Sequence, residues 1–310
     1  MVRNANAVCD CFRIIKIGEE RDPTMKYQLS NDARPQAMTL LLAAILSIAL
    51  WFIPFAEVLS YPFRIFVTFI HEGGHAIAAL VTGNSVQSLS VAMNGSGETY
   101  TTQGGLFSQM LVSSAGYIGA MTYGALLLVL IRRSVAARLV LVGSAAVVFA
   151  LTTVFGVVKP VMAGTGGSLS GLPFTLLAGV LISAGLFAVA RFASARVATF
   201  LVSFLAVQCV LNALLDLKTV FFLSSPFATT VPTDALNMAN ATGVPAIVWS
   251  VVWISLSVLI LAVTVRQYIG SRRSPSLGAT PELALGAGMN AFSMPALPSA
   301  SEQVRYDKSA

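Results

Sequence analysis

Seven apolar runs divide the chain, and each is long enough to cross a lipid bilayer as a helix. A membrane-spanning helix needs about 20 mostly apolar residues. Hydrophobic residues make up 56% of this chain and charged residues only 10%, whereas a soluble domain has about 25% charged residues. The pattern predicts an all-α polytopic membrane protein with about six to seven transmembrane helices. The runs are residues 37–55, 62–82, 106–131, 137–158, 172–190, 197–223 and 244–265.

The two ends of the chain are polar and set its predicted domain organisation. Residues 1–36 form an arm of mixed charge, and residues 271–310 are rich in Ser, Ala, Pro and Gly, a composition typical of disordered segments. Residues 37–270 between them form the predicted transmembrane domain. The arm contains a C-x-C pair, Cys9 and Cys11, which can bind a metal but has no other Cys or His nearby.

One polar segment, residues 83–105, interrupts the apolar pattern. Its first half alternates polar residues with apolar ones, its middle carries the turn signal Asn94-Gly95, and residues 99–102 form a second β-prone run. The segment therefore predicts a short β-hairpin associated with the membrane. Because open sheet edges cannot face lipid, we expect it at the interface, in an aqueous cavity or paired with another chain. Its apolar positions are Val86, Leu89 and Val91.

The basic residues favour a membrane surface over a nucleic acid. The net charge is +6, and the basic residues lie mostly in the arm, the short loops and the tail, which suits anionic lipid headgroups. No basic array interleaved with aromatic residues indicates a nucleic-acid partner. In a seven-helix arrangement most loop arginines fall on one side, so the positive-inside rule places the C-terminus in the cytoplasm.

The chemistry of the chain centres on residues 69–80, FIHEGGHAIAAL. His71 and His75 are the only histidines in the chain, and their spacing of four places both on one face of a helix. Two imidazoles so placed can hold one Zn²⁺, and Glu72 beside them can act as general base. The alternative is that both histidines make interhelical hydrogen bonds. Since ionisable groups in membrane segments are costly, three of them within five residues favour a functional site.

A catalytic zinc site usually has three protein ligands, so one more is sought among the few carboxylates. Asp216 lies inside an apolar run of membrane length, where a lone carboxylate needs a partner. We therefore favour Asp216 as third ligand, with Asp234, in the loop before the last apolar run, as the alternative. Lys218 is a poor partner for Asp216, because residues two apart on a helix do not face each other.

Two further features point to the surroundings of the site. Asn212 lies four residues before Asp216 on the same predicted face, where it can bind a ligand, a zinc water or substrate, or else make an interhelical amide contact. Small residues of the run 106–131 form a packing face typical of membrane helices. We expect the helix that carries the motif to be their neighbour, approached closely at Gly73 and Gly74.

Four stretches together resemble the site-2-protease-type intramembrane metallopeptidases of clan M50, and more closely their M50B-like branch. They are FVTFIHEGGHAIAALVTG with the hairpin after it, SSAGYIGAMTYGALLLVL, LNALLDL and TDALNMANATGVPAIVWSVVW. The resemblance implies one zinc held by His71, His75 and Asp216, with Glu72 as base. It also implies a multi-pass protein of a bacterial-type cytoplasmic membrane that cleaves single-span membrane proteins in the bilayer. The family's substrate pairs as a strand with a β element, a role that would fall here to residues 86–102.

The third motif departs from the family pattern, because Leu217 follows Asp216 where Gly is usual and no Pro is nearby. From all these observations we predict a zinc-dependent intramembrane endopeptidase, with substrate contacts from Asn212, Val86, Leu89 and Val91. Two alternatives belong to other classes. One is a transporter or channel with an intramembrane metal or proton site, although no inverted repeat supports it. The other is a catalytically silent protein of the same fold that binds membrane proteins.

Overall fold

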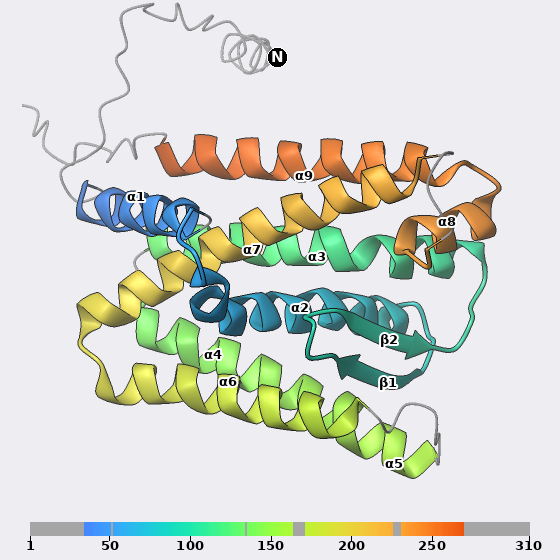
Figure 1. Cartoon of the computed structure of the whole chain (residues 1–310), viewed down its shortest axis with the longest axis horizontal. Coiled ribbons are helices and arrows are strands. Elements are labelled where there is room, and N and C mark those ends of the chain that lie inside the picture. The colour runs from blue at the N-terminus through green and yellow to red at the C-terminus, as the bar shows by residue number, and fades with distance from the viewer. Residues whose placement is uncertain (1–33, 51, 134, 164–170, 226–230, 270–310) are drawn as a thin grey trace, which may run out of the picture. The chain divides into compact units, whose positions relative to one another are not determined.

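The structure is a computed structural model that describes residues 34–50, 52–133, 135–163, 171–225 and 231–269 (Figure 1). The predicted polar arm up to residue 33 and the predicted tail, 271–310, lie outside the described residues, as do Cys9 and Cys11.

The described chain is mostly helical, with one small sheet, as the apolar pattern and the polar segment predict. Each predicted apolar run corresponds largely to helical structure, and the helix ends differ from the predicted bounds by a few residues. The elements are α1 (Arg34–Ala49), α2 (Ala56–Val81), β1 (Val86–Val91), β2 (Gly97–Thr101), α3 (Leu106–Arg132), α4 (Ala137–Ala150), η1 (Leu151–Val158), α5 (Lys159–Ala163), α6 (Leu172–Phe192), α7 (Ala195–Leu223), α8 (Asp234–Thr242) and α9 (Ala246–Ile269).

Five of the described helical stretches are long and apolar enough to cross a membrane: Leu106–Arg132, Ala137–Met162, Leu172–Phe192, Ala195–Leu223 and Ala246–Gln267. Large apolar side chains on them are exposed, for example Leu181 (61%) and Leu259 (58%), which suits a lipid environment. The count is below the predicted six to seven. The apolar part of α1 is a shorter helix, Ala37–Ala49, and α2 carries Glu57, Arg64 and Glu72 among its 26 residues.

Helix α2 lies among the other helices and packs along α3 (Figure 1). Its residues Ile65, Phe66 and Phe69 are at most 1% exposed and belong to the main apolar core. A helix surrounded by protein does not need an uninterrupted apolar surface, because its polar residues can meet other polar groups. The middle of the motif helix is therefore buried against protein, where His75 is 6% exposed, while its ends are exposed, as at Val58 and Val81.

The predicted β-hairpin is confirmed as a two-stranded antiparallel sheet of β1 and β2. It lies beside α2, at the end of the bundle where α8 is also found (Figure 1). Gly95 occupies the turn with a φ of 85°, a conformation that favours glycine. Its amide donates to the Ala92 carbonyl oxygen at 2.9 Å, which closes the turn that Asn94-Gly95 predicts.

The two strands have different surroundings. β1 packs against η1, α5 and α6, and Thr175 of α6 accepts a hydrogen bond from the Val91 amide at 2.9 Å. β2 packs against α2 with one face, and within the described residues no other strand pairs with its second edge. The outer edge of β1 is therefore bonded to α6 at Val91, and the outer edge of β2 has no strand partner among the described residues.

One stretch that the apolar pattern predicts as uniform helix is wound differently. Residues Leu151–Val158 form the π-helix η1 between α4 and α5, a conformation found mostly in short pieces and often beside functional sites. A Cβ on Gly73 would meet Leu151 Cδ1 at 2.6 Å. The π-helix thus packs directly on the glycine that follows Glu72.

Candidate active site

The two motif histidines face each other on α2, one turn apart. Their Nε2 atoms are 3.1 Å apart. His75 Nδ1 lies 2.7 Å from the Val112 carbonyl oxygen of α3. Because a carbonyl oxygen can only accept, Nδ1 carries the hydrogen and Nε2 of a neutral His75 keeps its lone pair. The backbone of α3 thereby prepares His75 to bind a cation through Nε2.

Close packing of α3 on α2 depends on glycine, as the small-residue face of α3 predicts. A Cβ on Gly116 would collide with the Nε2 atoms of both His71 and His75, and a Cβ on Gly74 would collide with the Ala115 carbonyl oxygen. Gly116 thus lies directly over the ligand atoms of the two histidines. No larger residue fits there without moving the imidazoles.

A Gly116→Ala substitution is therefore expected to lower both metal content and any peptidase activity, by at least about 100-fold for activity, since a 1 Å displacement at a reacting centre can cost that much. Gly143→Ala is the matched control, because a Cβ on Gly143 of α4 meets nothing within 4 Å. Metal analysis and cleavage assays on both purified variants check the prediction. If the metal content and cleavage rate of Gly116→Ala equalled those of Gly143→Ala and of wild type, α3 would not constrain the histidines.

The carboxylate that meets the histidines is Asp234, the first residue of α8. Its Oδ2 lies 3.5 Å from His71 Nε2 and 3.4 Å from His75 Nε2. Thr233 caps α8, because its hydroxyl accepts a hydrogen bond from the Leu236 amide at 3.2 Å. The cap fixes the start of the helix and so the position of Asp234. Burial alone raises the pKa of Asp234, but the positive charges that His75 and His71 carry when they are protonated outweigh burial and hold this pKa well below its usual range.

Among the described residues, His71, His75 and Asp234 form the group whose ligand atoms all lie within 4.8 Å of one another. Nitrogens bound at about 2.0–2.1 Å to one tetrahedral zinc ion would stand about 3.3–3.4 Å apart. The three observed separations, 3.1, 3.4 and 3.5 Å, are close to that value. The donor set therefore fits a single zinc-sized ion, and side-chain exposures of 15% for His71 and 21% for Asp234 leave access for water.

Asp216, the residue favoured from sequence as third ligand, is not in this group. It lies on α7, close enough to His71 and Arg64 to interact electrostatically with both. The apolar surroundings of Asp216 favour it in the sequence, but α8 packs on α3 and brings Asp234 onto the histidines. Among the described residues, Asp234, the alternative from sequence, is the carboxylate that lies with both histidines.

Glu72 lies beside the histidines and is 5% exposed. The Thr99 hydroxyl of β2 donates to Glu72 Oε2 at 2.7 Å. Its charge acts on His75, which places the carboxylate within electrostatic range of the ligand group. A buried carboxylate beside a metal-binding group is suited to accept a proton from a bound water.

The other predicted substrate contacts fall elsewhere. Asn212 of α7 donates to the carbonyl oxygen of Gln208 at 2.8 Å and to its side-chain oxygen at 3.1 Å, so its amide nitrogen is engaged within its own helix. Val86, Leu89 and Val91 of β1 are 2%, 1% and 0% exposed. These three side chains pack into apolar clusters. The apolar pattern of these three residues therefore reflects the packing of β1 against the core.

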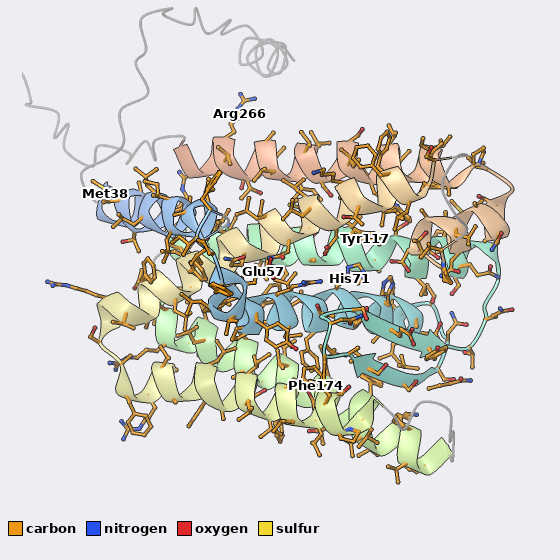
Figure 2. All side chains as sticks on the ribbon, viewed as in Figure 1. Met38, Glu57, His71, Tyr117, Phe174 and Arg266 are labelled. Carbon is orange, nitrogen blue, oxygen red and sulfur yellow. The ribbon has the colours of Figure 1, made fainter. Side chains whose placement is uncertain are left out.

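Sequence reasoning did not single out Tyr117 of α3, which Figure 2 labels near His71. Its ring packs edge-on against His71, with centroids 4.6 Å apart, and its side chain lies near the Asp234 carboxylate. Trp253 of α9 packs on the other side of Tyr117 at 5.4 Å and donates to Ser114 Oγ at 3.0 Å. The available signal was a single Tyr in a run of small residues, SSAGYIGA.

Comparison with protein families gives one match over most of the chain. A family model described as Peptidase M50B-like matches residues 39–264, which include α2, the hairpin, α8 and most of α9. Searches of curated proteins and of solved structures give no match. With its apolar helices, the match makes this chain a multi-pass membrane protein. The chain belongs to the Peptidase M50B-like family.

Proposed function

We propose that this protein is a zinc-dependent intramembrane endopeptidase in which His71, His75 and Asp234 hold the zinc ion and Glu72 is the general base. One observation carries the proposal. Three side chains from α2 and α8 bring their ligand atoms within 4.8 Å of one another, directly beside the buried Glu72 carboxylate. The family match supports peptidase chemistry, and the five apolar helices support its location in the membrane.

When bound here, zinc would supply a water of pKa about 7 and polarise the substrate carbonyl. The residues of the chain do the rest. Glu72 takes a proton from the attacking water and returns it to the leaving amine. His75 keeps its orientation through the Val112 carbonyl oxygen, and the ring of Tyr117 packs against His71. The surrounding apolar helices exclude bulk water, which strengthens each of these electrostatic interactions.

We assign substrate pairing to β2 in place of Val86, Leu89 and Val91. A peptide bond inside a helix is shielded from attack, whereas an extended segment exposes its carbonyl and can satisfy its amides on a sheet edge. No described strand pairs with the outer edge of β2, and its inner face meets Glu72 through Thr99. A single-span membrane protein, locally unwound along β2, would present its peptide bond near Glu72. We keep the expected cytoplasmic C-terminus as part of this proposal.

The test is reconstitution of the full chain in phosphatidylethanolamine and phosphatidylglycerol vesicles. The probe is a doubly tagged single-span reporter whose apolar segment contains helix-weakening Gly and Pro residues. We expect the reporter to be cut into two fragments, and mass spectrometry should place the cleaved bond within its apolar segment. An intact reporter together with zinc or proton flux into the vesicles would instead favour the transporter. An intact reporter that co-purifies with the protein would favour the silent binder.

A further inference from the structure

The strand β2 reaches the proposed base directly. Thr99 Oγ1 lies 2.7 Å from Glu72 Oε2 and 3.2 Å from the Glu72 backbone oxygen. A hydroxyl has one hydrogen to donate, and the shorter contact is the one to the carboxylate. Hydrogen bonds to a charged acceptor are about twice as strong as neutral ones. This contact therefore fixes one carboxylate oxygen of Glu72.

A second residue of the same strand holds the other side of the carboxylate. A Cβ on Gly97 would come within 2.5 Å of Glu72 Oε1 and within 2.8 Å of Cδ, so the backbone of β2 packs against the carboxylate at this point. Gly97, Thr99 and Thr101 alternate with the exposed Glu98 and Tyr100 along the strand. The inner face of β2 thus leaves the Glu72 side chain little freedom to rotate.

The hairpin is itself fixed on α2, which makes the position of Thr99 reproducible. Tyr61 donates from its hydroxyl to the Met93 carbonyl oxygen at 2.6 Å. Thr68, one helical turn before Glu72, donates to the Gly95 carbonyl oxygen at 2.9 Å. The turn and the strand are therefore both attached to the helix that carries Glu72.

We infer that Thr99 is a positioning residue for Glu72, and that β2 links substrate pairing to the alignment of the base. This inference rests on the proposed function. The strand whose outer edge would take the substrate is the strand whose inner face holds the carboxylate. Thr99 does not need to touch the reacting atoms. It acts by keeping Glu72 in one rotamer, pointed at the water it deprotonates.

The first test measures cleavage of the single-span reporter in vesicles by three variants. Thr99→Val keeps the side-chain shape without the hydroxyl, and we expect kcat to fall about 10- to 100-fold while KM and zinc content change less than about twofold. Thr99→Ser keeps the hydroxyl and should recover most of kcat. Thr199→Val on α7 is the matched control, since it makes the same chemical change at a threonine whose hydroxyl donates to the Ala195 carbonyl oxygen of its own helix at 2.9 Å, and it should behave as wild type.

A second measurement does not depend on activity or on zinc. In the metal-free full chain, the Tm losses caused by Thr99→Val and Glu72→Ala should overlap, so that the double variant loses clearly less than their sum. The losses from Thr199→Val and Glu72→Ala should add. Additive losses for Thr99 and Glu72, an unchanged kcat in Thr99→Val, or failure of Thr99→Ser to restore kcat would overturn the inference. If the wild-type protein does not cleave the reporter, the proposed function fails. The Tm comparison still shows whether Thr99 and Glu72 interact.

Discussion

Replacing Glu72 with Gln is expected to abolish measurable cleavage of the single-span reporter. General acid–base catalysis contributes about 10²- to 10⁴-fold to the rate, and a carboxamide cannot take the proton from the attacking water. Gln has nearly the same shape, and its amide oxygen can still accept from Thr99. Zinc content should therefore stay at the wild-type value. Initial cleavage rates and metal analysis on the same preparations measure both effects.

The matched control for this substitution is Glu57→Gln. Glu57 lies in the first turn of the same helix (Figure 2) and is exposed, so the change in charge is identical but far along the helix from the histidines. Cleavage should be unaffected. If Glu72→Gln cleaved the reporter at the wild-type rate, Glu72 would not be the base and the peptidase mechanism proposed for this site would be untenable.

Substituting Asp234 with Ala is expected to remove most of the bound zinc, and with it the activity. Losing an outer partner of a metal ligand typically weakens metal binding 10- to 100-fold, and loss of a ligand itself should exceed that. Asp216→Ala provides the comparison, because it also removes a carboxylate near His71 but not one from the ligand group. It should retain zinc. Metal-to-protein ratios of the two purified variants, at equal free zinc, decide between the two residues.

The opposite pattern would return the ligand role to Asp216. Zinc kept in Asp234→Ala and lost in Asp216→Ala would mean that α7, not α8, completes the site. Loss in both variants would mean that each carboxylate is needed to hold the metal. Circular dichroism of each variant separates these outcomes from a general loss of helical structure.

The local patterns of the sequence predict much of this architecture. Apolar runs of spanning length mark the helices, and Asn94-Gly95 marks the turn of the hairpin. The spacing of four between His71 and His75 predicts their meeting, since it depends only on helix geometry. The small-residue face of α3 correctly predicts its packing on α2, because glycine is needed wherever two helix backbones approach closely.

Contacts between distant parts of the chain were harder to predict. Whether Asp216 or Asp234 reaches the histidines depends on how the chain returns after α7, which no local pattern encodes. Thr99 resembles any β-prone residue until the hairpin is placed against α2. The pattern of Val86, Leu89 and Val91 predicts that one face of β1 is apolar, but it does not predict that helices bury that face.

The most direct test of the proposed zinc site is X-ray absorption at the zinc edge on the full chain in vesicles. We expect one zinc per chain, bound by nitrogen and oxygen atoms at about 2.0–2.1 Å, with scattering from two imidazole rings. The imidazole signal should be lost in a His71→Ala, His75→Ala double variant. A zinc shell containing sulfur at about 2.3 Å would place the metal on cysteines such as Cys9 and Cys11, and that result, or the absence of bound zinc, would contradict the account.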